Sequence, residues 1–162
     1  MFVKSIPNAV KSDGTLVPYE IGKGYNLGIG TYYIDVGIPD ADHVSVHCTW
    51  DANIVFTSLV YQSSNMPAYA SESAPYTDSS GAVDVSIYAA DTGGIWLTEN
   101  PSTAYVPIVG TGVTVTNMTV AATGGAGGAM FEIANANSRR ARMKIVTTTG
   151  GYFRQHAHGK QA

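Results

Sequence analysis

"RRARMKIVTTTGGYFRQHAHGK", residues 139–160, carries the pattern on which the predicted fold of this chain depends. Apolar and polar residues alternate on both sides of Gly150 and Gly151, as in two β-strands that each bury one face. A two-residue turn at the glycines would place apolar side chains opposite charged ones. A three-residue loop, Thr149-Gly150-Gly151, instead places the apolar side chains on one face and the charged side chains on the other. The stretch therefore predicts a hairpin with this longer loop.

The hairpin register divides the side chains of the two strands between two faces. The face predicted to lie in the core contains Ala141, Met143, Ile145, Phe153 and Ala157. The opposite face would form a basic strip, and its six candidate partner-binding residues are Arg140, Arg142, Lys144, Arg154, His156 and His158.

The charge distribution supports a role for this strip. Residues 133–162 contain six of the nine Lys and Arg residues and none of the twelve Asp and Glu residues. Nucleic-acid proteins usually combine a net basic domain with stacking aromatic residues, whereas this chain has a net charge of −3 and only Tyr152 beside the strip. The pattern favours contact with an acidic surface of this chain or of a neighbouring subunit. A solvated face without a partner is the remaining alternative.

Composition predicts the fold class. The 162 residues are enough for one domain with a substantial core. Val, Ile, Thr and Tyr are abundant, and no stretch sustains the 3.6-residue period of a long amphipathic helix. We expect an all-β fold, an antiparallel, jelly-roll-like β-sandwich of about eight or nine strands.

Individual segments refine this expectation. Residues 31–38 and 44–50 alternate as half-buried strands do. Cys48, in the second of these strands, is predicted to be a buried structural thiol. Residues 54–61 are apolar on both faces and predict a central strand. Residues 62–81 predict a long surface loop, and shorter strands are expected at 83–87, 95–98 and 105–109. The two-residue alternation of apolar side chains shifts by one position within residues 113–120, which predicts a β-bulge near Asn117. "TGGAGGAM", residues 123–130, lacks the Lys-Ser/Thr of a phosphate loop and predicts a hairpin connection.

The N-terminal segment has scattered apolar residues, prolines and a Gly22-Lys23-Gly24 break. We interpret residues 1–29 as an extended N-terminal arm outside the core, and residues 30–162 as the β-sandwich domain. No uninterrupted apolar stretch resembles a signal peptide or approaches a membrane span, so neither export by such a signal nor a membrane location is expected.

Candidate chemical sites in the sequence are sparse. His156 and His158 have a spacing that could place two imidazoles on one metal, with His43 or His47 completing the set, but the neighbouring cations oppose this. Asp40 and Asp42 could offer calcium ligands without the patterned loop of known calcium motifs. No hydrolase or metalloprotease motif is present. We expect no metal, no cofactor and no enzymatic activity.

The arm "MFVKSIPNAVKSDGTLVPYEIGKGY" and the small-residue strands "GVTVTNMTVAATGGAGGAMFEI" and "RRARMKIVTTTGG" resemble those of the small β-sandwich virion proteins of tailed bacteriophages, particularly head decoration (cement) proteins. The resemblance covers architecture and composition. It implies a structural subunit, often trimeric, that binds and reinforces the outer capsid lattice. The partners would be the major capsid protein or other virion subunits, with self-association as a homotrimer. The protein would be made in the host cytoplasm and located on the outer capsid surface.

A second function class is a carbohydrate- or receptor-binding module of a phage tail or bacterial surface protein. Its predicted binding residues are Tyr61, Tyr69 and Tyr76, in and beside the 63–80 loop.

Overall fold

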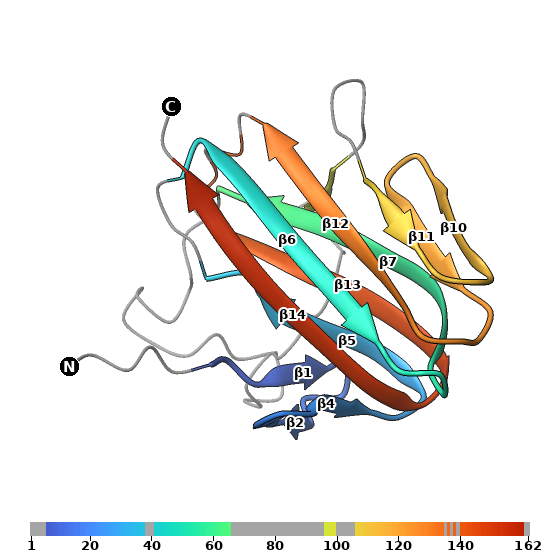
Figure 1. Ribbon diagram of the computed structural model, residues 1–162. Coiled ribbons are helices and arrows are strands. Elements are labelled where there is room, and N and C mark those ends of the chain that lie inside the picture. Colours follow the sequence, from blue (N-terminus) through green and yellow to red (C-terminus); the bar gives the residue numbers. More distant parts are fainter. Residues whose placement is uncertain are drawn as a thin grey trace.

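The computed structural model shows an all-β, sandwich-like fold of two antiparallel sheets (Figure 1). It describes residues 6–37, 41–65, 96–99, 106–134, 136, 138 and 140–160. Within these ranges every regular element is a strand, and there are 14 of them rather than eight or nine. The all-β class is confirmed. Several additional strands are only two to four residues long and lie in segments where the sequence pattern predicted none.

The larger sheet has eight strands. Its central strands β7 and β13 are ten residues long, and its order is β10-β11-β7-β13-β5-β1-β2, with β8 paired to β7. The bounds are β1 Ala9–Lys11, β2 Leu16–Val17, β5 Gly30–Asp35, β7 Val55–Ser64, β8 Leu97–Thr98, β10 Val113–Thr116, β11 Thr119–Ala122 and β13 Arg140–Thr149. The prediction of a central strand over residues 54–61 is confirmed, although β7 continues to Ser64 into the expected loop.

The smaller sheet has six strands in the order β3-β4-β14-β6-β12-β9. The bounds are β3 Tyr19–Glu20, β4 Gly24–Leu27, β6 His43–Trp50, β9 Ile108–Val109, β12 Gly127–Ala134 and β14 Gly151–Lys160. In Figure 1 the three long strands β14, β6 and β12 form the layer in front of β5, β13 and β7.

The long strands alternate between the sheets along the chain. β5, β7 and β13 belong to the larger sheet, whereas β6, β12 and β14 belong to the smaller one. The predicted hairpin of residues 139–160 is therefore wrong: β13 pairs with β5 and β7, and β14 pairs with β4 and β6. The predicted three-residue hairpin loop Thr149-Gly150-Gly151 does not form, because the chain crosses from one layer to the other at Gly150 and Gly151.

This corner is closely packed. A Cβ atom on Gly150 would lie 2.5 Å from the carbonyl oxygen of Leu27, and one on Gly151 would lie 2.6 Å from Oδ1 of Asp51. The same Asp51 accepts the backbone N–H of Tyr152 through Oδ2 at 3.1 Å and that of Asn53 through Oδ1 at 3.0 Å. The Asp51 carboxylate thus connects the β6–β7 turn with the β13–β14 corner, and glycine is required where the segments meet.

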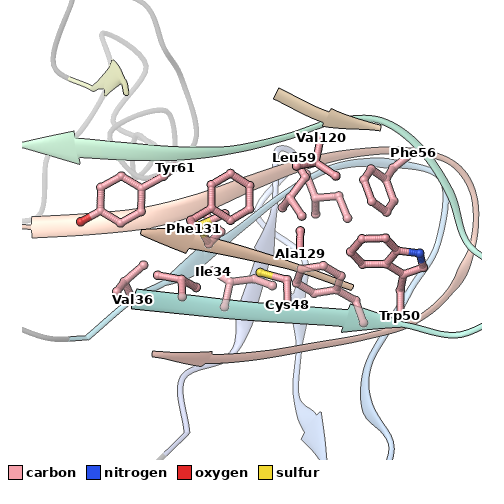
Figure 2. Packing of buried hydrophobic residues seen from close by; sticks show 14 of the residues in the cluster. Ile34, Val36, Cys48, Trp50, Phe56, Leu59, Tyr61, Val120, Ala129 and Phe131 are labelled. Atoms are coloured by element: carbon pink, nitrogen blue, oxygen red, sulfur yellow. The ribbon is translucent and has the colours of Figure 1, made fainter. Parts of the chain in front are cut away.

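The core fills the space between the two layers (Figure 2). Trp50 and Phe56 meet edge to face with ring centroids 4.8 Å apart, and Phe153 is paired in register with Trp50. Cys48 is fully buried, and burial raises the pKa of its thiol, which confirms the structural interpretation of this residue. The expected core positions Ala141, Met143, Ile145 and Phe153 are buried, and Ala157 packs at the margin of the cluster.

The expectation of an arm outside the core is wrong for residues 6–29. Strand β1 pairs with β5 in the larger sheet, and β4 pairs with β14 in the smaller sheet. Ala9, Tyr25 and Leu27 are at most 1% exposed and belong to the core cluster. The Tyr25 hydroxyl donates a hydrogen bond to the carbonyl of Pro7 at 2.6 Å, and burial raises the pKa of Tyr25 to about 12. The segment lacked a clear period because its strands are short and alternate between two sheets.

The phase change in residues 113–120 has a different origin from the predicted bulge. Asn117 and Met118 both have positive φ, 48° and 61°, and join β10 to β11 with Thr116 paired to Thr119. Positive φ at both central residues is the signature of a tight type I′ hairpin. The following glycine-rich stretch is not a hairpin connection either, because it takes the chain from β11 in one sheet to β12 in the other.

Several expectations lie outside the described residues. They concern the strand at 83–87, most of the loop at 62–81, and Asp40.

Gly24 tests whether the N-terminal segment is an integral part of the domain. Its φ is +103°, and a Cβ atom would lie 2.5 Å from the carbonyl oxygen of Phe153 on β14. We predict that Gly24→Ala lowers the free energy of unfolding by about 2 kcal/mol or more. Gly22→Ala is the matched control, because Gly22 has a similar φ of +82° and open space around it. Urea unfolding measures both, and equal costs would contradict a structural role of the β4–β14 contact.

Candidate functional site

The six residues predicted to form one basic strip lie in two different sheets. Arg140, Arg142 and Lys144 are on β13 in the larger sheet, whereas the other three, Arg154, His156 and His158, are on β14 in the smaller sheet. Each trio points away from the core, as the alternation predicted. The outward faces of two stacked sheets lie on opposite sides of the molecule, so the single strip does not exist.

Arg142 is buried rather than available to a partner. It is 3% exposed, and its Nε donates a hydrogen bond to Oε1 of the buried Gln62 at 2.8 Å. The guanidinium carbon lies 4.0 Å from the ring centroid of Tyr33 and 4.1 Å from that of Trp96. A cation between two aromatic faces is stabilised by their quadrupoles. Arg142 therefore holds the ring of Trp96 against the outer side of the larger sheet.

The other two cations of β13 are also partly covered. The guanidinium carbon of Arg140 lies 5.0 Å from the Trp96 ring centroid, and Lys144 is half-buried between Tyr33 and Val60 in the strand register. The outer side of the larger sheet is thus occupied at this point by Trp96. Sequence alternation could not reveal this, because Trp96 is more than 40 positions away from the strand that it covers.

The cations of β14 remain exposed. Arg154, His156, His158 and Lys160 all point outward and are exposed. Beside them, β6 directs His43, Ser45, His47 and Thr49 to the same side, with Val44, Val46, Cys48 and Trp50 in the core. We call the outward surface of β14, β6 and β12 the histidine face, because it contains all four histidines of the chain: His43, His47, His156 and His158.

The strand register places the histidines close together. His156 is directly opposite His47, and antiparallel partners have Cβ atoms about 4.5–5.5 Å apart. His158 is opposite Ser45, and Lys160 is opposite His43. The sequence indicated the outward face of β6 correctly, but it placed β14 beside β13. The sequence grouped His43 or His47 with His156 and His158 only as possible metal ligands, and it left Lys160 of β14 out of the basic strip.

One carboxylate lies within the histidine face. Glu132 of β12 interacts with Nε2 of His43 at 3.0 Å and accepts a hydrogen bond from the Ser45 hydroxyl at 3.0 Å. The contact with His43, together with that of Ser45, holds the pKa of Glu132 below its ordinary value. Glu132 therefore remains ionised in mildly acidic solution and offsets part of the positive charge.

A pocket of about 280 Å³ opens at one end of the face, lined by Lys23, Thr49, Trp50, Asp51, Tyr152 and Arg154. Arg154 donates hydrogen bonds to the carbonyls of Gly22 and Lys23, at 2.6 and 3.1 Å, which hold the β3–β4 turn against β14. The Lys23 ammonium lies 5.9 Å from the Tyr152 ring centroid. The pocket combines an aromatic surface, two cations, the hydroxyls of Thr49 and Tyr152 and the carboxylate of Asp51, a set able to bind polar groups.

The described residues contain no group of three or more His, Cys, Asp and Glu side chains arranged to hold a metal ion. The face can instead present a cationic surface, formed by Arg154 and Lys160.

Comparison of the chain with protein families, curated proteins and solved structures finds no match. The fold and the face are therefore described from the chain itself. In the ranges that the structure describes, no helix is long and apolar enough to cross a bilayer.

Charge reversal distinguishes the two sets of cations. We predict that Arg142→Glu lowers the free energy of unfolding by about 3 kcal/mol or more, because a carboxylate would be buried against Tyr33, Trp96 and Gln62. Lys160→Glu makes the same charge change on an exposed strand position, and its cost should be about 0.5 kcal/mol or less. Urea unfolding followed by circular dichroism measures both. A stable Arg142→Glu variant would contradict the observed packing of Arg142.

Glu132 should make stability depend on pH. Because its pKa is lower in the folded state, its contribution is present above the unfolded-state pKa and is lost as pH falls through the folded-state value. We predict that Glu132→Gln is less stable than wild type at neutral pH by up to about 1 kcal/mol, since the pair is partly exposed. The difference should be smaller at about pH 3, which lies below the ordinary carboxyl pKa, where the contribution of Glu132 is decreasing. Urea unfolding at both pH values measures this, and a constant difference would contradict it.

Proposed function

We propose that the chain is a structural, jelly-roll-like β-sandwich subunit that binds an acidic surface of a larger assembly through the histidine face. The observation that carries this proposal is the exposure of Arg154, His156, His158 and Lys160 along one strand. Charge complementarity across an interface steers association and fixes register. The arginines of β13, by comparison, are already engaged: Arg140 with Trp96, and Arg142 with Trp96 and Tyr33.

The particular assembly we propose is a phage head. The resemblance to head decoration proteins supports an outer capsid location, with the major capsid protein or another virion subunit as the partner, and a binding role rather than an enzymatic one. A sheet face with three long strands is a broad and rigid surface, which suits attachment to a repeating lattice. Its cations would meet carboxylates on the capsid subunits.

We also propose self-association, as a homotrimer. Residues 6–29 expose four large apolar side chains: Ile6 at 51%, Leu16 at 59%, Ile21 at 94% and Ile29 at 68%. Apolar surface of this kind commonly marks contact with another protein. Light scattering should show a trimer, and Leu16→Asn with Ile21→Asn should shift the population toward monomer.

For the carbohydrate-binding alternative, the structure changes which residues could form the binding site. Tyr61 is 1% exposed, and burial raises the pKa of its hydroxyl to about 12, so it is not an exposed sugar platform. Tyr69 and Tyr76 lie outside the described residues. The pocket at Tyr152 and Lys23 is the observation that now favours this alternative, because aromatic and polar groups combine in sugar-binding sites.

The deciding experiment mixes the purified protein with undecorated capsids of the virus that encodes it and measures bound copies per capsid. We expect binding that saturates at a fixed number of copies and weakens with salt. The variant His156→Glu with Lys160→Glu should remain folded and bind weakly, whereas Thr148→Glu, an exposed position on the other sheet, should bind normally. No saturable binding to capsids, together with saturable binding of a glycan that Tyr152→Ala abolishes, would replace this function with the alternative.

A further inference from the structure

All four histidines of the chain lie on a single face, although they come from two segments more than 100 positions apart. His43 and His47 are on β6, and His156 and His158 are on β14, with His47 and His156 directly opposite each other. Imidazole is the side chain whose ordinary pKa places its charge change between pH 5 and pH 8. The histidine face therefore brings together, on one surface, the residue type best suited to respond to mild acidification.

The fixed charges around the histidines determine the sign of this change. The charged and titratable groups on and beside the face are Arg154 and Lys160 of β14, Glu132 of β12, and Lys23, Glu20, Asp51 and Tyr152 at the end with the pocket. The oxygens of Asp51 accept backbone N–H groups, and Glu132 is engaged with His43 and Ser45. Each protonated imidazole therefore adds to a surface that already carries permanent cations along β14.

We infer that the histidine face binds an acidic protein surface, and that protonation of His47, His156 and His158 strengthens this binding. This inference rests on the proposed function and adds to it a regulation by pH. Near neutral pH the attraction depends on Lys160, Arg154 and Lys23. In mildly acidic solution the imidazoles between Arg154 and Lys160 would add positive charge to the central part of the face, beyond what Glu132 offsets. A continuous cationic strip then extends along β14 and β6.

Carboxylates fit this face better than a nucleic acid does. Stacking aromatic side chains provide much of the affinity for single strands. Along the described part of the face, the one aromatic residue is Tyr152, at the end beside the pocket, and the middle contains Met130, Ser45 and the imidazoles.

The test uses the full chain and a deca-aspartate peptide, capped at both ends and labelled with a dye insensitive to pH. Fluorescence anisotropy measures the Kd at about pH 5.2 and about pH 7.4, on either side of the ordinary imidazole pKa. A constant ionic strength of about 20 mM limits screening. Near-UV circular dichroism at both pH values verifies that the protein remains folded. We expect the Kd to be at least about fivefold lower at the acidic pH, as several exposed ion pairs are added.

Two variants separate the sources of affinity. His47→Gln with His156→Gln should reduce the ratio of the two Kd values by at least about half, because two of the titrating groups are removed. Lys160→Gln should weaken binding at both pH values by a similar factor and keep the ratio. Glutamine retains hydrogen-bonding capacity at an exposed position, so both variants should fold.

Each outcome has a distinct meaning. Equal binding by wild type at both pH values overturns the pH inference and leaves the acidic partner of the proposed function intact. Absence of binding at both pH values overturns that acidic partner itself. If the variant with His47→Gln and His156→Gln keeps the wild-type ratio of the two Kd values, the role of the histidine pair is overturned. The oligonucleotide (dT)11 has ten phosphates, and if it binds more than about tenfold tighter than the peptide, the face is a nucleic-acid surface instead.

Discussion

The corner at Gly150 and Gly151 is the constraint on which the arrangement of this protein depends. The carbonyl of Leu27 and the carboxylate of Asp51 approach the two glycines so closely that neither position has room for a Cβ atom. The chain consequently leaves β13 in the larger sheet and enters β14 in the smaller one. Two long adjacent strands that could have paired with each other instead become central strands of separate layers, and the core lies between them.

This separation gives similar side chains different functions. Arg142 and Arg154 both follow the same alternation and both point away from the core. Arg142 is covered by Trp96 and becomes part of the packing, with its charge stabilised by two aromatic faces and Gln62. Arg154 remains exposed and holds the β3–β4 turn through backbone carbonyls. The difference arises from what lies beyond each sheet and not from the residue type.

Much of the fold was predictable from local pattern. The period of two in β6, β13 and β14 assigned Val46, Cys48, Met143 and Phe153 to the core correctly, because side-chain direction in a strand depends only on the pleat. Prediction failed where short strands change sheets. Residues 6–29 show no sustained period, since none of the strands that begin there before β5 exceeds four residues. At Asn117 a change of phase indicated a bulge, whereas two residues with positive φ form a hairpin turn.

The candidate site, like the fold, was only partly predictable from the sequence. The sequence by itself determined the all-β class and which side chains share one side of each strand, including the outward positions of His43, His47, His156 and His158. Only the tertiary structure decided that β14 lies beside β6 rather than β13, and so that the four histidines form one face while Arg142 is buried. The physical reason is that alternation is a local property of the extended backbone. The neighbour of a strand depends on hydrogen bonds and packing with residues far along the chain, here at a corner with no room for a side chain.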